Sequence, residues 1–238
     1  MSLIVTVCVP EGLVIAGDSR LTYDWTIGEN KYSTPMSDSI PKIFSIKNKF
    51  GLGTCAAADI NGIPISGFIN QFIEKQIKEE TTVDQIPELL LDFFCKKSER
   101  NINFYVIGYK VEDGISVPHI YWISTENKII SRERFVNEQV IYGANWAGEY
   151  DVLDRIMSKV KIQNWVTEEW IDLEYTPFVW SFMTLQDAID FANYAIHTTI
   201  ETMRFQERKK TVGGPIDILV IKPNEEPIWI KKKILRSE

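Results

Sequence analysis

Three residue types in this chain have the chemistry to activate a hydroxyl group as a nucleophile. They are a serine close to the amino terminus, Ser2, a lysine, Lys42, and an aspartate, Asp18. A serine hydroxyl needs a base at neutral pH, and a free α-amine on the same residue, with a reference pKa of about 8, can serve. A nearby lysine ammonium would lower the pKa of both groups, and a carboxylate would keep that lysine charged and in place. Removal of Met1 would give Ser2 such an amine.

The elements that must position these residues begin with the stretch from Ser2 to Arg20. Two apolar runs, Leu3 to Val9 and Leu13 to Gly17, flank a short turn and are rich in β-branched residues, which predicts a β-hairpin. Apolar residues occupy both alternating positions, so neither face of the hairpin suits water. The second run ends in the polar residues Asp18 to Arg20, and such strand ends commonly carry chemistry on a rigid base.

This opening resembles a known family. An apolar strand, a tight turn and the sequence Gly-Leu-Val-Ile-Ala-Gly-Asp-Ser-Arg at residues 12–20 are similar to the start of proteasome β-subunits and their bacterial relatives HslV and Anbu, which are N-terminal nucleophile hydrolases. In that family the nucleophile is the first residue of the mature chain, usually threonine, at a nearly fixed distance from the turn aspartate. Counting back from Asp18 by that distance gives Ser2.

The resemblance extends to other parts of the site. The stretch Pro41 to Ile46 looks like the family's strand that carries the catalytic lysine, which implies that role for Lys42 and an orienting role for Asp18. The strand leading to residues 57–59 looks like the one that donates a backbone N–H to the oxyanion, and Cys55 stands where the family has glycine. The catalytic set that the resemblance implies is Ser2, Asp18, Lys42 and Cys55.

Besides Cys55, three positions depart from the family's pattern. Ala144 stands where the family has an active-site serine. Lys209 and Val212 stand where active proteasomes have an aspartate and a serine that support the nucleophile. These departures favour a second interpretation, a catalytically inactive subunit or scaffold that retains the fold and the assembly surface. Ser2, Asp18 and Lys42 favour the enzyme, a proteasome-like peptidase.

The first three residues also allow an interpretation without function. Met-Ser-Leu can be a translation start followed by filler, or an expression-vector scar, and Ser2 would then have no chemical role. A retained Met1 would place the amine of Ser2 inside a peptide bond. The state of Met1 therefore decides whether Ser2 has its own base.

Composition limits the class of protein. At 238 residues the chain suits one sizeable domain, and we expect a single domain over residues 1–238. The net charge of −7 argues against nucleic acid as the main partner, because phosphate binding needs clustered Lys and Arg. No apolar run approaches the roughly 20 residues that span a bilayer, and the start lacks the features of a secretory signal. We therefore expect a cytoplasmic protein without membrane contact.

The cysteines and histidines predict neither a disulfide nor a metal site. Cys8, Cys55 and Cys95 are odd in number, lack C-x-x-C spacing and lie among apolar residues, which indicates buried reduced thiols. His119 and His197 lie far apart and lack the spacing of zinc ligands. We expect no cofactor and no metal.

The order of elements predicts the architecture. The expected helices cover residues 63–79, about ten residues after Thr82, 147–160 and 184–207. The expected later strands cover 42–46, 50–58, 102–109, 115–124, 128–135, 139–144, 211–221 and 227–235, with a loop containing short strands at 21–40. This order suggests an α+β protein in which two sheets pack between helix layers. We expect the four-layer αββα sandwich of N-terminal nucleophile hydrolases.

The resemblance also implies partners. Members of the family work as rings whose helices pack between subunits, so we expect a homo-oligomer, in the form of a ring, that acts on a peptide or protein substrate. An ATPase is a possible partner. The segment from Gln163 to Met183 mixes aromatic and acidic residues, which suits either a contact surface or buried packing, with buried packing slightly favoured.

Overall fold

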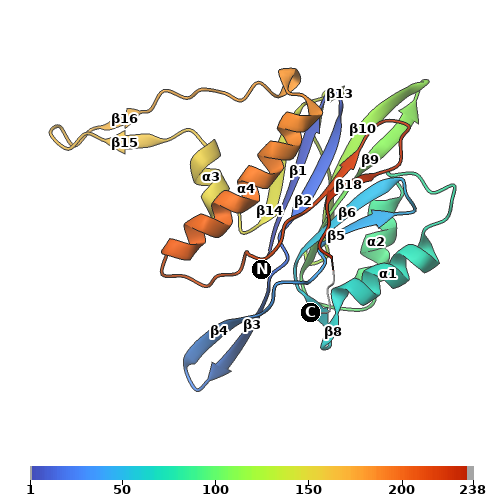
Figure 1. Cartoon of the computed structure of the whole chain (residues 1–238), viewed down its shortest axis with the longest axis horizontal. Coiled ribbons are helices and arrows are strands. Elements are labelled where there is room, and N and C mark those ends of the chain that lie inside the picture. The colour runs from blue at the N-terminus through green and yellow to red at the C-terminus, as the bar shows by residue number, and fades with distance from the viewer. Residues whose placement is uncertain (1, 235–238) are drawn as a thin grey trace.

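The computed structural model describes residues 2–234 and contains two five-stranded sheets (Figure 1). Four two-stranded sheets complete the strands of this described part of the chain. Because helices and strands are mixed along the sequence, the fold belongs to the α+β class. Met1 and the last residue of the expected strand 227–235 lie outside the described residues.

The first sheet contains β1 (Leu3–Val9), β2 (Gly12–Gly17), β14 (Gly143–Gly148), β17 (Asp217–Ile221) and β18 (Ile228–Lys231), in the order β14-β1-β2-β17-β18. The second contains β5 (Ile43–Ile46), β6 (Phe50–Ala56), β9 (Ile102–Glu112), β10 (Ile115–Ser124) and β11 (Ile129–Glu133), in the order β11-β10-β9-β6-β5. The two-stranded sheets are β3 (Leu21–Ile27) with β4 (Asn30–Ser37), β7 (Asp59–Ile60) with β8 (Ile63–Pro64), β12 (Phe135–Val136) with β13 (Gln139–Val140), and β15 (Lys161–Gln163) with β16 (Trp170–Asp172). The α-helices are α1 (Ile65–Gln76), α2 (Ile86–Cys95), α3 (Asp151–Met157) and α4 (Leu185–Phe205).

The predicted hairpin β1–β2 forms the middle of the first sheet, and every residue of both strands is buried. β14 pairs with the free edge of β1, and β17 pairs with that of β2, all antiparallel. Alternate side chains of β1 enter two different cores: Leu3 and Val5 pack with α4, whereas Ile4 and Cys8 join residues of the second sheet. Two buried faces explain why apolar residues occupy both alternating positions of this hairpin.

Helices cover the outer faces of the sheets. α4 packs on β1, β2 and β17 of the first sheet. α1 and α2 pack on each other and share a hydrophobic cluster with the second sheet, in which Phe94 contacts Phe72 and Phe104. In Figure 1, α4 lies on the opposite side of the sheets from α1 and α2.

The two sheets approach each other closely near the start of β1. Ile4 and Ile15 of the first sheet and Ile43 of the second belong to one buried cluster. A Cβ atom on Gly53 would lie 2.8 Å from Ile4 Cγ2 and 2.9 Å from Ile15 Cδ1, closer than real side-chain atoms approach. Glycine at this position in β6 therefore permits the close packing of the sheets beside the lysine strand.

Several predicted boundaries were wrong. The strand expected over 139–144 is divided between β13 and β14, and the strand expected over 211–221 begins only at Asp217. The helix expected over 147–160 is shorter, because pairing with β1 holds the chain in strand β14 as far as Gly148, opposite Leu3, and α3 begins only at Asp151. Residues 21–40 were expected to be a loop with short strands. They form instead the long hairpin β3–β4, which projects from the sheets (Figure 1).

The aromatic segment from Gln163 to Met183 is largely exposed, which corrects the preference for buried packing. Trp165 is 95 % exposed and Phe182 is 85 % exposed. The hairpin β15–β16 extends away from the sheets (Figure 1). Trp180 does reach α4, where its ring packs edge-on against Phe191 with centroids 4.8 Å apart. Phe178 also packs against Phe191, and Met183 packs against the cluster under α4, whereas Trp165 and Trp170 present apolar surface to solvent.

Candidate functional site

A buried carboxylate at the end of β2 connects four segments of the chain. Asp18 Oδ1 accepts hydrogen bonds from the Leu3 N–H (3.0 Å) and from Lys42 Nζ (2.7 Å). Its Oδ2 accepts from the N–H groups of Arg20 (3.1 Å) and Gly213 (3.0 Å). Asp18 is fully buried. The start of β1, the residue before β5, the chain after β2 and the chain before β17 therefore meet at one side chain.

Lys42 is 4 % exposed and lies directly against Asp18. Its Nζ also donates to the Arg20 carbonyl (2.8 Å), and its own carbonyl accepts from the Thr54 N–H (2.9 Å). Burial lowers the pKa of Lys42, and the charge of Asp18 opposes this shift. The structure thus brings two of the four candidate residues into contact.

Ser2 lies at the same end of the first sheet and is 7 % exposed. The Leu3 N–H that donates to Asp18 belongs to the peptide bond between Ser2 and Leu3. By strand alternation Ser2 shares the face of Ile4, which packs toward the second sheet. A single carboxylate oxygen therefore joins the backbone next to Ser2 to the Lys42 ammonium.

Gly148 makes room for Ser2 on its other side. A Cβ atom on Gly148 would lie 1.7 Å from the Ser2 carbonyl oxygen, and the φ of Gly148 is +104°, so the position requires glycine. The Ser2 carbonyl accepts from the Glu149 N–H (2.9 Å). The buried Glu149 carboxylate in turn binds Arg208 (2.6 Å) and Thr211 (2.6 Å). The chain between β14 and α3 is thus hydrogen-bonded to the start of β1 through the Glu149 N–H.

Ala144 does not occupy the place that the sequence analysis gave it beside the nucleophile. It lies opposite Val7 in the pairing of β14 with β1, buried in the core under α4. Gly148 and Glu149, which do contact Ser2, were missed because a helix was expected to begin at residue 147. The sequence feature that could have identified them is a glycine, Gly148, that ends an apolar run and directly precedes the acidic residues at the start of a helix.

The end of β6 lies beside this cluster. Because the Thr54 N–H donates to the Lys42 carbonyl, the N–H of the following Cys55 points the other way, toward Asn103 of β9, which lies opposite it. The N–H of Ala56 points back to the side of Lys42, and Ala56 has a φ of +77°. This direction argues against the Cys55 N–H as the oxyanion donor and favours the Ala56 N–H.

The side chain of Cys55 does not compete as a nucleophile. Burial raises the pKa of its thiol to about 12, although the charge of Lys42 acts in the opposite direction. Burial also raises the pKa of Cys8 to about 12. Because the thiolate is the nucleophilic form of cysteine, both thiols are unreactive at neutral pH.

Two glycines allow the segment before β17 to pack against Arg20. A Cβ atom on Gly213 would lie 2.4 Å from Arg20 Cζ, and Gly214 has a φ of +75°. Arg20 binds both carboxylate oxygens of Asp38 (2.7 and 2.8 Å), and its guanidinium lowers the pKa of that carboxylate. This ion pair joins the base of the hairpin β3–β4 to the site.

Lys209 and Val212 lie outside the cluster around Asp18. Lys209 pairs with Asp24 of the hairpin β3–β4 (3.0 Å), where both side chains are largely exposed. Val212 is buried in the core under α4. Thr211, between them, reaches Glu149 instead. The carboxylate and hydroxyl that support the nucleophile in the resembled family thus have no counterpart at these two positions.

A cavity of about 530 Å³ opens beside the cluster. Ala56 and Gly148 both line it, so it adjoins the end of β6 and the residue that contacts Ser2. The remaining lining residues come from β9, β10, β11, β14 and the chain next to them. Ser2, Asp18 and Lys42 do not line the cavity themselves, so it adjoins the cluster without containing it.

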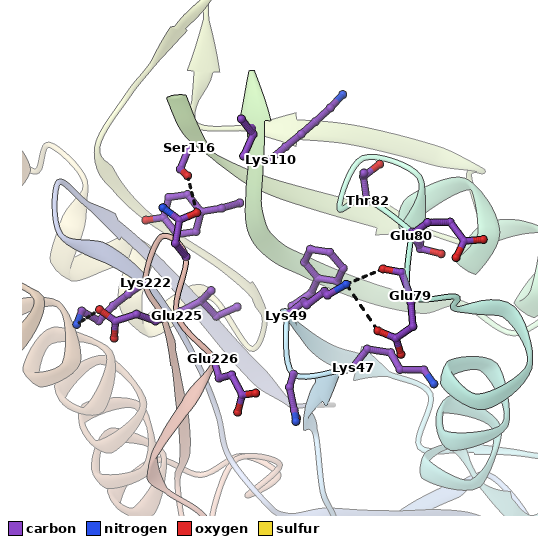
Figure 2. Close-up of a pocket in the computed structure, with 17 residues that line it drawn as sticks. Lys47, Lys49, Glu79, Glu80, Thr82, Lys110, Ser116, Lys222, Glu225 and Glu226 are labelled. Carbon is purple, nitrogen blue, oxygen red and sulfur yellow. Dashed lines mark hydrogen bonds and ion pairs between the residues drawn. The ribbon is translucent and has the colours of Figure 1, made fainter. Parts of the chain in front are cut away.

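A larger cavity, of about 970 Å³, lies at the other end of the sheets, around the turn between β5 and β6 (Figure 2). In Figure 2, Lys49 points toward Glu79, and Lys222 pairs with Glu225 at 2.6 Å. Phe50 at this end and Ala56 at the site are opposite ends of the same strand. The larger cavity therefore lies away from Ser2 and has no part in the chemistry proposed there.

None of the helices between residues 2 and 234 has the length and apolar character to cross a membrane. Within the same residues, no group of three or more His, Cys, Asp or Glu side chains has the arrangement to hold a metal ion. No protein-family model and no curated protein matches the chain. The case for an activity therefore rests on the geometry around Asp18.

Asp18→Ala should destabilise the fold far more than Lys42→Met. Removal of the carboxylate leaves three backbone N–H groups and a buried ammonium without their acceptor, which should cost roughly 3–5 kcal/mol. Lys42→Met leaves Asp18 with its three backbone donors and should cost roughly half of that or less. Urea denaturation, which gives the free energy of unfolding, measures both.

Asp92→Asn is the matched control, because Asp92 pairs with Lys96 on the exposed surface of α2. This substitution should change the free energy of unfolding by less than about 0.5 kcal/mol. An unfolding free energy for Lys42→Met as low as that for Asp18→Ala would show that the ion pair, rather than the backbone acceptor, holds these segments together.

Proposed function

We propose that this chain is a peptidase of the proteasome β-subunit type, an N-terminal nucleophile hydrolase whose two sheets and flanking helices form a four-layer αββα sandwich. The packing of α4 on one sheet, of α1 and α2 on the other, and the hydrophobic cluster between the sheets support this architecture. The proposed site lies at the end of the sheets where β1 begins.

One observation carries the proposal. Asp18 Oδ1 accepts from both the peptide N–H after Ser2 and the Lys42 ammonium. An ammonium held this close to the start of β1 would favour the anionic form of the Ser2 hydroxyl and the neutral form of a free Ser2 amine. Both changes favour nucleophilic attack by Ser2, because the hydroxyl can transfer its proton to the neutral α-amine of the same residue.

In the proposed reaction, Ser2 Oγ attacks the carbonyl carbon of a peptide bond while the α-amine of Ser2 takes the hydroxyl proton. The Ala56 N–H donates to the oxyanion of the tetrahedral intermediate, whose charge the Lys42 ammonium also stabilises. The protonated amine then gives its proton to the leaving nitrogen, and the C–N bond breaks. Water, deprotonated by the same amine, hydrolyses the ester on Ser2 and restores the hydroxyl.

A second candidate is a subunit that keeps the fold and the assembly surface without catalysis. It is favoured by the two positions at which active members of the resembled family have an aspartate and a serine that support the nucleophile. Here Lys209 binds Asp24 at the surface and Val212 is buried in the core. The polar contact to the backbone of Ser2 on that side comes from the Glu149 N–H, and Thr211 donates to the Glu149 carboxylate. Peptide hydrolysis separates the two candidates.

Cleavage of short peptide amides should appear once Ser2 is the first residue, and Ser2→Ala should abolish it without loss of the fold. An amide nitrogen cannot accept the proton, so a preparation that retains Met1 should be inactive. Intact-mass measurement paired with a fluorogenic peptide assay tests both statements. Ser181→Ala, at an exposed position in the aromatic segment, is the matched control and should keep full activity.

Hydrolysis that persists in Ser2→Ala, or in a preparation shown to retain Met1 completely, would sink the assignment of Ser2 as nucleophile. Absence of hydrolysis in a chain that begins with Ser2 would instead favour the inactive subunit. Circular dichroism of each preparation shows that the comparison is made between folded proteins.

We further propose that the chain forms a closed homo-oligomer through its aromatic segment. Trp165 and Trp170 carry much of the exposed apolar surface of the hairpin β15–β16 and its turn, and isolated proteins seldom expose aromatic groups so fully. In a symmetric assembly each hairpin would bind a neighbouring copy.

Light scattering at micromolar concentration should therefore give a mass that is a multiple of the 27.5 kDa chain. Replacement of both tryptophans by serine should lower that mass, because the contact would lose its apolar side chains. Glu126→Gln, on the exposed turn after β10, is the control and should leave the mass unchanged. A strictly monomeric mass for the unmodified chain would contradict the assembly proposal.

A further inference from the structure

We propose that the cavity beside Ser2 selects a positively charged side chain of the substrate, with Glu133 as its counter-ion. That the ligand is a substrate rests on the proposed peptidase function. The cavity, its charge and its walls are properties of the described residues and hold without that function.

The position of the cavity ties it to the reacting residues. Ala56, the proposed oxyanion donor, and Gly148, which touches the Ser2 carbonyl, both line it. Asn103, another lining residue, lies opposite Cys55 in the pairing of β6 with β9. A peptide bond held at Ser2 would therefore direct a neighbouring side chain into this space.

The cavity carries one formal charge, which is negative. Glu133 is the only Asp, Glu, Lys, Arg or His among its lining residues. Its Oε2 accepts from Asn145 Nδ2 (2.9 Å), whereas the nearby guanidinium of Arg134 binds Asn145 Oδ1 and the Ala144 carbonyl. The charges of Arg134 and Glu133 act on each other, but Arg134 does not line the cavity, so the charge that a ligand meets there is the half-buried carboxylate, which favours a cationic ligand.

The other polar groups of the cavity add no second charge. The side-chain amides of Asn101 and Asn103 are neutral. The hydroxyl of Tyr105 stays protonated, because burial and the charge of Glu133 raise its pKa, while the charge of Arg134 acts in the opposite direction. Glu133 is therefore the lining group that attracts a cation.

Aromatic rings form the walls. Tyr105 of β9, Trp122 of β10 and Trp146 of β14 all line the cavity. The indole N–H of Trp146 donates to Asp154 (2.7 Å), which fixes that ring. A planar guanidinium stacks on such rings and donates five N–H groups, so arginine fits this set of groups better than lysine.

Peptides that differ only by arginine or citrulline test the charge, because citrulline has nearly the same shape and no charge. We expect kcat/KM to be about tenfold or more higher for arginine than for citrulline at one of the two positions that flank the cleaved bond. Two peptide sets, one for each position, cover both cases. Equal rates for arginine and citrulline at both positions would overturn the proposal.

Glu133→Gln should remove most of this preference, because glutamine keeps the acceptor for Asn145 and loses the charge. Glu126→Gln, which removes a carboxylate from an exposed turn, should leave the arginine-to-citrulline ratio as in the unmodified chain. A ratio that survives unchanged in Glu133→Gln contradicts the role of Glu133.

Binding to Ser2→Ala separates this inference from the peptidase proposal. N-acetyl-arginine amide should change the tryptophan fluorescence of Ser2→Ala, and N-acetyl-citrulline amide should bind about tenfold more weakly or not at all. Loss of the arginine effect in Ser2→Ala combined with Glu133→Gln supports the cavity even if no peptide is hydrolysed. Equal binding of both amides to Ser2→Ala would overturn the cavity assignment while leaving the peptidase proposal untouched.

Discussion

The structure depends on the ability of one buried carboxylate to bind four donors. Asp18 can be fully buried with its charge because three backbone N–H groups and one ammonium occupy its oxygens. These donors come from segments that are far apart in the sequence, so the same side chain fixes the start of β1, the lysine before β5 and the chain that enters β17. The proposed catalytic role of Lys42 uses a position that the fold already requires.

The second constraint on the site is that segments of the chain must approach one another closely, and glycine permits this because it has no Cβ atom. Gly148 admits the carbonyl of Ser2, and Gly213 admits the guanidinium of Arg20. In each case a single added carbon would displace a segment bound to Asp18 or to Ser2 itself. The cavity that Ala56 and Gly148 line lies next to this close approach, and polar and aromatic side chains complete its lining.

The sequence predicted those parts of the fold in which periodicity and turn residues act locally. The hairpin β1–β2, the strands β5 and β6, and helix α4 with its capping residues Thr184 and Asp187 lie close to their predicted positions. Positions set by pairing between distant strands could not be read in this way, since the register of β14 on β1 decides that Gly148 rather than Ala144 meets Ser2. The direction of the N–H groups in β6, which favours Ala56 over Cys55, likewise depends on the partner strand. Exposure of the aromatic segment was misjudged because composition alone does not show what covers a tryptophan.

The central claim is that the hydroxyl of Ser2, activated by its own amine and by Lys42, is the nucleophile. Covalent labelling tests it most directly. A chain that begins with Ser2 is incubated with a peptide β-lactone, which acylates an activated nucleophile, and the adduct is located by mass spectrometry of the digested protein. The account predicts one adduct per chain, on Ser2, that is absent from Ser2→Ala and strongly reduced in Lys42→Met. An adduct on another residue, or equal labelling of a chain that retains Met1, would contradict it.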